Sequence, residues 1–328
     1  MSEIRVNNIT NRDGSTGTTV AGIPVVDSNS HFVVPTGRTG QRYVDGGENI
    51  VRDGLVLHLD AKYSYPSKTG ITSTTDSLDP DVYTWYDLSG NGNDGELKSG
   101  VSYSGNDGGF LDFDGSTTNS TVVVGNTVAN SFSQITVECW IKPDTVPSSD
   151  FVFEEIFGAD DGSSGNLESV FLIAINHNNT GTDLPASFVG NVITFGVRTI
   201  GQVERIRPIL IPSNTSYDLF TYGMAMSVNP SEYVANTWMN LTGVYTGEET
   251  FLYINGQFKG SSSNQPNGGN KSVKGILNNS FITRNIGSSS GGDNRFDGKV
   301  AVSKIYDRAL TAAEVLQNYN ALKDRFGL

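Results

Sequence analysis

Short segments with a period of two residues recur along this chain from Gly54 onward, and they restrict its fold more than any other feature. Every second residue is Leu in residues 55–59, and every second residue is Ile, Val or Cys in residues 135–141. Asn255-Gly256 lies between two further segments and is typical of a tight hairpin, because both residues tolerate positive φ. With 38 glycines available for turns and no alternation of strands with helices, the pattern predicts an all-β sandwich of about a dozen antiparallel strands.

A single helix is expected, and it follows the last strand. Thr311 and Glu314 have the spacing of a capping box, in which the two residues cap each other's backbone N–H groups. The residues after them place apolar side chains on one stripe of a helix: Val315, Leu316, Tyr319, Leu322 and Phe326. We expect this amphipathic helix to pack against the edge or rim of the sandwich.

Residues 1–53 differ in composition from residues 54–328, to which we assign the sandwich. They contain no Trp, no Leu and no helical period, and about 50 residues of this kind cannot bury enough surface to offset their ordering entropy. We therefore expect an extended arm that becomes ordered by packing on neighbouring chains. The alternative is a leader that folds back on its own domain. Residues 199–236 are expected to form an inserted loop or hairpin within the sandwich.

The charge and composition of the chain argue against several classes of partner. Acidic residues outnumber basic ones 35 to 22, and the net charge of −13 repels phosphate backbones, so no nucleic-acid partner is expected. No stretch approaches the roughly 20 apolar residues that span a bilayer, and no apolar run near Met1 suggests a secretory signal. Cys139 is the single cysteine, which excludes an intramolecular disulfide, and we expect it to be an inert thiol on the core face.

No catalytic machinery is predicted, so the chain is not expected to be an enzyme. A retaining glycosidase needs two carboxylates about 5 Å apart, usually at alternating positions of one strand. The adjacent pairs Glu154-Glu155 and Asp160-Asp161 would instead point to opposite faces of a strand. The second pair precedes a Gly- and Ser-rich stretch and is expected in a solvated loop. His58 alternates with the core leucines and is expected on the opposite face of its sheet, and no G-x-S-x-G motif accompanies the histidines.

Six segments resemble concanavalin A-like, laminin-G-type domains, in order and in spacing. They are GLVLHLDA at 54–61, WYDLSGNGNDGEL at 85–97, FLDFDG at 110–115, ITVECWIKP at 135–143, FLYINGQFKG at 251–260 and FDGKVAVSKIYDRALTAAEV at 296–315. The resemblance implies a two-sheet antiparallel jelly roll with one C-terminal helix, preceded here by the extended N-terminal arm. It also implies carbohydrate binding as the usual role.

Two segments of the arm resemble N-terminal segments of virion structural proteins from tailed bacteriophages, especially marine ones: SEIRVNNIT at 2–10 and HFVVPTGRTGQR at 31–42. The resemblance implies a virion location, with other virion structural proteins bound through residues 1–53. A homo-oligomer such as a trimer is expected by the same analogy, although no coiled-coil or collagen-like stretch dictates the number of chains.

The loop from Asp87 to Gly95 is the strongest candidate site in the sequence. Its carboxylates, amides and exposed carbonyls are hard oxygen ligands on a flexible backbone, as calcium requires, although the spacing is not that of an EF-hand. The alternative is that Asp and Asn side chains form Asx-turns in a tight connection. Related folds often hold calcium at the rim of the sandwich, so two acids further along the chain are added to the possible ligands. The candidate ligands of a structural calcium ion are Asp87, Asn91, Asn93, Asp94, Asp114 and Asp297.

Carbohydrate binding would need an aromatic platform beside polar groups on loops. The candidate contacts are Trp85, which lies close to a loop, and Tyr217, Tyr222 and Tyr233 in the inserted segment. The alternative is that the tyrosines pack the insertion onto the domain or onto a neighbouring chain. Trp140 and Trp238 fall in strand patterns and are expected in the core.

Three functions follow from these observations as hypotheses. The leading one is a phage virion protein whose sandwich is displayed outward, as a tail fibre or adhesin that attaches to host-surface glycans, or as a decoration of the capsid or tail. The alternative is a secreted or surface carbohydrate-binding module of a bacterium, which would carry an export signal or a neighbouring domain. A glycoside hydrolase with unfamiliar catalytic acids is the third.

Overall fold

The computed structural model divides the chain into two compact units, Met1–Asn49 and Ile50–Leu328, and each is described by itself. The structure describes residues 18–20, 23–26, 49–64, 83–125, 131–146, 152–160, 169–178, 190–200, 223–227, 229–264, 272–277, 283–288, 292 and 294–328. In the first unit, strand β1 (Thr18–Val20) pairs antiparallel with β2 (Ile23–Val26). The boundary between the units lies close to residue 53, where the sequence places the end of the arm.

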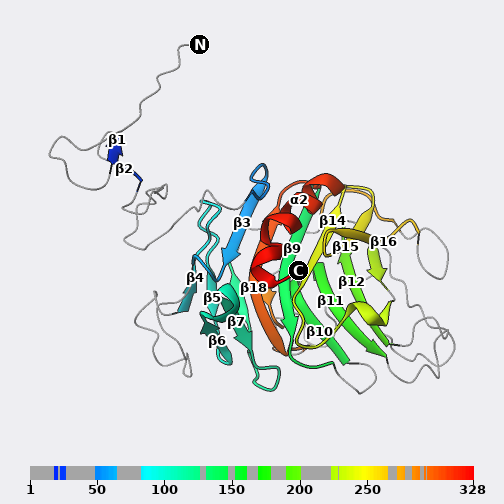
Figure 1. Cartoon of the computed structure of the whole chain (residues 1–328). Coiled ribbons are helices and arrows are strands. Elements are labelled where there is room, and N and C mark those ends of the chain that lie inside the picture. Colours follow the sequence, from blue (N-terminus) through cyan, green and yellow to red (C-terminus); the bar gives the residue numbers. More distant parts are fainter. Residues whose placement is uncertain are drawn as a thin grey trace, which may run out of the picture. The chain divides into compact units, whose positions relative to one another are not determined.

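The second unit is a sandwich of two antiparallel sheets (Figure 1). Sheet 1 has the strand order β13-β12-β11-β10-β17-β8-β5-β4. Its strands are β4 (Thr84–Trp85), β5 (Gly95–Leu97), β8 (Val122–Val124), β10 (Val152–Asp160), β11 (Ser169–Asn178), β12 (Gly190–Val197), β13 (Met224–Ser227) and β17 (Thr283–Ile286). Within the predicted insertion at 199–236, the described residues form β13 and the short 3-10 helix η3 (Pro230–Glu232).

Sheet 2 has the order β16-β15-β14-β9-β18-β7-β6, and β3 also pairs with β18. Its strands are β3 (Leu55–Asp60), β6 (Val101–Ser104), β7 (Phe110–Phe113), β9 (Ile135–Pro143), β14 (Met239–Tyr245), β15 (Thr250–Ile254), β16 (Gln257–Ser261) and β18 (Gly298–Tyr306). A 3-10 turn, η1 (Asn106–Gly108), precedes β7. The expected fold class, a two-sheet antiparallel sandwich, is confirmed.

The period-two segments place their apolar residues between the two sheets, as expected. Leu57 and Leu59 are fully buried in the core that both sheets share. Leu55 is an exception, because an irregularity in the pairing of β3 with β18 turns it toward the outer face, where it is only partly buried. Cys139 is buried in the core, and burial raises the pKa of its thiol to about 12, which makes it unreactive as predicted.

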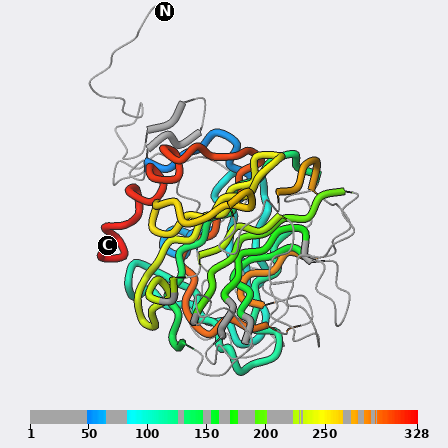
Figure 2. The backbone as a smooth tube through the Cα atoms, turned by 90° about the vertical axis from the view of Figure 1, so that its right-hand side faces the viewer, coloured from blue at the N-terminus to red at the C-terminus, as the bar shows by residue number. Residues whose placement is uncertain are grey.

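The C-terminal helix α2 (Ala312–Leu322) begins with the predicted capping box and continues into η4 (Lys323–Phe326). The Thr311 hydroxyl accepts from the Glu314 N–H, and the Glu314 carboxylate accepts from the Thr311 N–H. The helix lies outside the layered strands (Figure 2), over the outer face of sheet 2 instead of its edge or rim. The prediction of an edge position is therefore wrong, because this outer face carries apolar residues that need cover. Among the described residues, no helix is long and apolar enough to cross a membrane.

Candidate functional site

The predicted calcium loop is organised around the buried carboxylate of Asp87, between β4 and β5. Its Oδ1 accepts the backbone N–H groups of His58 and Ser89, both at 2.9 Å. Its Oδ2 accepts the Asn93 N–H at 3.0 Å and the Ser89 hydroxyl at 2.7 Å. Three N–H groups and one O–H group therefore donate to the two oxygens of Asp87. This agrees with the alternative that the sequence left open, in which Asp and Asn side chains form the turns of a tight connection.

The other polar residues of this loop tie it to β3. The side-chain amide of Asn93 donates to the Val56 carbonyl at 2.8 Å, and that of Asn91 donates to the Leu55 carbonyl at 3.2 Å. Asp94 accepts the backbone N–H of Asp87 at 2.8 Å. Calcium needs six to eight oxygen ligands that point to one centre, whereas these side chains satisfy backbone groups. In this arrangement the side chains of the loop hold its turn together, and the calcium site stays a prediction.

The two distant acids do not complete such a site either. Asp114 accepts hydrogen bonds from Ser116 and Thr117, and these bonds lower the pKa of its carboxyl to about 2. Asp297 accepts from the Thr145 hydroxyl at 3.2 Å. Across the described ranges, no group of three or more His, Cys, Asp or Glu side chains could hold a metal ion. Asp114 therefore serves a local turn, and Asp297 contacts a loop that is distant in sequence.

The predicted aromatic contacts are not on the surface where the structure describes them. Trp85 lies beside the loop, as expected, but its side chain is fully buried in the core, so the prediction that it contacts a glycan is wrong. Tyr233 is also buried, and its hydroxyl donates to Glu154 at 2.8 Å, so its ring offers no open face to a sugar. Burial and the charge of Glu154 raise the Tyr233 pKa above its ordinary value. Tyr217 and Tyr222 lie outside the described residues.

The acid pair Glu154-Glu155, which was considered as a pair of glycosidase carboxylates, is split between two faces of β10. The register pairs Glu154 with Ile175 and Glu155 with Ala174, so the two consecutive side chains point in opposite directions, as expected. Both are buried. Of the second pair, Asp160 ends β10, and Asp161 lies outside the described residues, so its predicted solvated loop is not described either.

An exposed aromatic residue does occur on β16, at the edge of sheet 2. Phe258 is 55% exposed. Among the side chains that the structure describes, no other aromatic one is exposed. Its ring contacts those of Phe251 and Tyr253 on β15, with centroids 6.3 and 5.9 Å away. We call these three residues the β16 aromatic patch. The sequence analysis did not identify this patch, although Phe251 and Tyr253 alternate with the core residues Leu252 and Ile254 and so mark the opposite face of β15.

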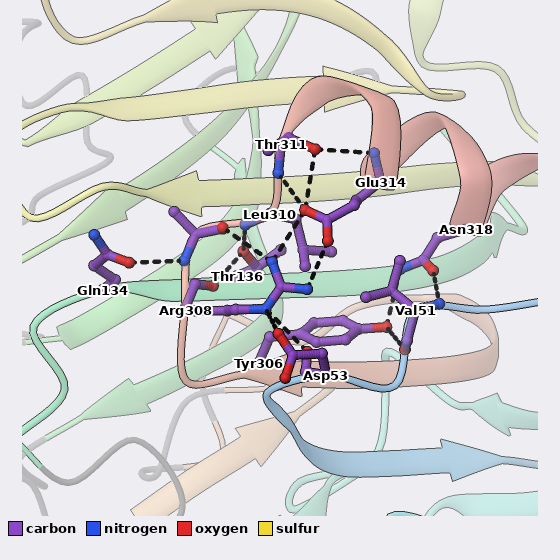
Figure 3. Close-up of polar contacts among 11 residues, drawn as sticks. Val51, Asp53, Gln134, Thr136, Tyr306, Arg308, Leu310, Thr311, Glu314 and Asn318 are labelled. Carbon is purple, nitrogen blue, oxygen red and sulfur yellow. Dashed lines mark hydrogen bonds and ion pairs between the residues drawn. The ribbon is translucent and has the colours of Figure 1, made fainter. Parts of the chain in front are cut away.

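A second polar arrangement, which we call the junction clamp, fixes the start of the second unit to its end (Figure 3). Arg308 forms an ion pair with Glu314, with Nη2 2.6 Å from Oε1, and a second one with Asp53 at 3.0 Å. The Arg308 hydrogen bonds lower the pKa of Glu314 to about 2. The Thr136 hydroxyl donates to the Arg308 carbonyl at 2.8 Å and accepts the Leu310 N–H at 2.9 Å. The clamp therefore joins the start of β3, strand β9 and the capping box of α2.

Both backbone groups of Val51 belong to the same clamp. Its N–H donates to Asn318 Oδ1 at 2.8 Å, and its carbonyl accepts the Tyr306 hydroxyl at 3.0 Å. The Asn318 amide also donates to the Tyr306 oxygen at 2.9 Å. Asn318 was not singled out from the sequence, but it lies three residues after Val315 on the stripe that faces the sheet. The point at which the chain joins the sandwich is thus fixed by α2 and β18.

A buried charged group lies next to this clamp, between sheet 2 and α2. Glu138 on β9 accepts from Lys304 at 3.0 Å and from Asn240 at 3.1 Å through Oε1, and from Asn318 at 2.8 Å through Oε2. The side chains of Glu138 and Lys304 have no exposure. A charge in such a place is tolerated only when it is paired and hydrogen-bonded.

His58 lies beside this group, opposite Lys304 in the register of β3 and β18 and on the outer face, as expected. Its Nε2 is 4.0 Å from Asp60. Burial, with the positive charges of Lys304, Arg52 and Arg325, lowers the His58 pKa well below its ordinary value. The imidazole is therefore neutral around pH 7 and belongs to the packed layer under α2.

Comparison with known proteins gives one family. Residues 114–316 match the family model of the concanavalin A-like lectin/glucanases superfamily. No curated protein sequence matches the chain.

Several solved structures are similar in fold. The binding domain of Paraclostridial mosquitocidal protein 1 is 20% identical at a TM-score of 0.49, with 82% of this chain and 52% of that chain covered. A Trypanosoma rangeli sialidase in complex with the inhibitor DANA is 12% identical at a TM-score of 0.47, with 81% of this chain and 32% of that chain covered. A third structure is domain 4 of AbnA, a GH43 extracellular arabinanase from Geobacillus stearothermophilus, in complex with arabinotriose. It is 18% identical at a TM-score of 0.44, with 81% of this chain and 98% of that chain covered. The chain thus spans about half of the first of these proteins and about a third of the second.

Proposed function

The chain belongs to the concanavalin A-like lectin/glucanases superfamily, and from this premise we propose that its sandwich is a non-catalytic glycan-binding module displayed on a tailed-bacteriophage particle. The family match agrees with the resemblance of the six sequence segments to laminin-G-type domains. In this proposal the sandwich binds a glycan of the host surface. Residues 1–53 bind other virion structural proteins.

The β16 aromatic patch is the observation that carries the glycan-binding part of the proposal. A sugar ring presents C–H groups on its faces, and an aromatic ring that is open on one side can cover them while polar groups nearby fix the orientation. Phe258 is open in this way, and Phe251 and Tyr253 support its ring from β15.

Replacing Phe258 with Ala is expected to weaken glycan binding about tenfold, because burying the open half of a Phe ring contributes about 1–1.5 kcal/mol. A glycan array of the full chain identifies the ligand, and titration calorimetry measures the loss. The matched control is Ile276→Ala, which removes another exposed apolar side chain, 46% exposed, outside the patch. Binding should persist in EDTA, because the predicted calcium ligands satisfy protein groups. An array without any bound glycan, or equal binding by the Phe258 variant, would contradict the proposal.

The junction clamp supports the display part of the proposal. A module carried by its N-terminal segment meets any load where the chain joins the sandwich, and the clamp fixes Val51 and Asp53 at that point. The resemblance of residues 2–10 and 31–42 to phage virion segments suggests the particle as the carrier.

Deletion of residues 1–49 is expected to abolish incorporation into particles, because the deleted residues make the contacts to other virion proteins. The measurement is the amount of the protein in purified particles assembled with the deletion variant. Glycan binding by the truncated chain should remain unchanged, since Ile50–Leu328 has its own core. Incorporation at the level of the full chain would refute the anchoring role and leave the glycan-binding role standing.

A further inference from the structure

A buried amine, carboxylate and amide lie together under α2. Lys304 Nζ donates to Glu138 Oε1 at 3.0 Å, and Asn318 Nδ2 donates to Glu138 Oε2 at 2.8 Å. Lys304 lies directly opposite Glu138 in the register of β18 and β9, so the sheet itself holds this pair together. The side chains of Lys304 and Glu138 have no exposure, and Asn318 is 1% exposed. One carboxylate therefore connects an amine with a side-chain amide away from water.

The carbonyl of Asn318 is activated by the clamp. Its Oδ1 accepts the Val51 N–H at 2.8 Å, and a backbone N–H in this position stabilises negative charge that develops on a carbonyl oxygen under attack. Its Nδ2, the group that would leave, is bound to Glu138. Asn240 also donates to Glu138, but through the oxygen that Lys304 uses, and its Oδ1 accepts the Thr242 hydroxyl at a longer 3.2 Å. Asn318 is thus the better electrophile of the two.

We propose that Lys304 and Asn318 join in an intramolecular isopeptide bond, with Glu138 as the proton carrier. Glu138 takes a proton from the Lys304 ammonium, and the lone pair of the free amine forms the Nζ–Cγ bond to Asn318. The Cγ–Nδ2 bond then breaks, while Glu138 passes protons from Nζ to Nδ2, and the nitrogen leaves as ammonium. Nothing is oxidised or reduced, and no further reactant is needed. An amine is required at position 304, because an Arg in the same ion pair would not be a nucleophile.

The bond would join α2 covalently to β18, beside the point at which the chain joins the sandwich. It would thereby secure the C-terminal helix against a load applied through Val51. The inference depends on the geometry of these side chains and not on the proposed function, so glycan binding and the cross-link can fail independently.

Mass spectrometry of the purified full chain tests the bond. The intact wild type is expected to be lighter by one ammonia than its sequence requires. Trypsin should leave Lys304 uncleaved and release residues 300–308 joined to residues 309–323. Lys304→Arg and Glu138→Gln should have the full mass, with circular dichroism to confirm that they fold. The control Asn240→Ser should keep the loss of ammonia.

Two results would overturn the inference. A wild-type digest in which trypsin cleaves after Lys304 and residues 309–323 appear alone would show that no bond forms. A cross-link from residues 300–308 to residues 206–259, which contain Asn240, would show that Asn318 is the wrong partner. The wild-type digest decides both questions, so a variant that does not fold leaves the test intact.

Discussion

Replacing Arg325 with Met is expected to destabilise the sandwich by about 3–5 kcal/mol, because it leaves a buried carboxylate without its partner. Arg325 Nη1 donates to both oxygens of Asp60 at 2.9 Å, and its Nη2 donates to the Gly109 carbonyl at 3.1 Å. The Asp60 side chain has no exposure, and that of Arg325 is 8% exposed. Met keeps most of the apolar stem of the side chain and removes its charge.

Urea unfolding of the wild type and the variant measures this loss of free energy. The matched control is Lys98→Met, because the Lys98–Glu96 pair at 2.5 Å is a surface pair, with side chains 35% and 63% exposed. The Lys98 substitution should lower the free energy of unfolding by less than about 1 kcal/mol. Adding Asp60→Asn to the Arg325 variant should recover part of the loss, because a neutral amide costs less to bury than a carboxylate. Equal losses for the Arg325 and Lys98 variants would contradict the account of a buried pair.

The strands and the capped helix could be predicted from the sequence because their signals are local. Alternation in residues 135–141 marks a strand wherever it lies, and the spacing of Thr311 and Glu314 defines a helix start without reference to the rest of the chain. The face opposite the core was harder to interpret. Glu138 alternates with the core residues of β9 and therefore faces away from the core, yet it is fully buried because α2 covers it.

Most of the candidate site could not be predicted from the sequence. The exposure of a side chain depends on which element of the fold covers its face. Trp85 stands next to a Gly-rich loop in the sequence, but its own two-residue strand pairs with β5 and turns the ring into the core. Phe258 follows a tight turn in an edge strand, where a neighbouring strand covers only one side. No local pattern distinguishes these two aromatic residues. The polar residues of the Asp87 loop left two interpretations open for a similar reason, because calcium ligands and turn residues have the same composition.

Replacing Trp140 with Ala is expected to lower the free energy of unfolding by about 3–5 kcal/mol, because removing a buried Trp side chain leaves a cavity. The ring is fully buried between β9 and α2. It stacks on Phe326, with centroids 4.4 Å apart, and lies parallel to Tyr319 at 5.8 Å. The lost contacts are those that hold α2 and η4 on sheet 2, so the cavity should also loosen the helix locally.

Hydrogen exchange distinguishes this local effect from a general loss of stability. In the Trp140 variant, the amides of residues 312–326 and of Val51 should lose protection together, because the Val51 N–H is bound by Asn318, which lies on α2. The matched control is Leu316→Ala on the same helix, whose side chain is 44% exposed, and it should change the free energy of unfolding by no more than about 0.5 kcal/mol. Protection that persists at Val51 while α2 exchanges would mean that the helix does not hold the start of the sandwich, and the junction clamp would lose its role in display.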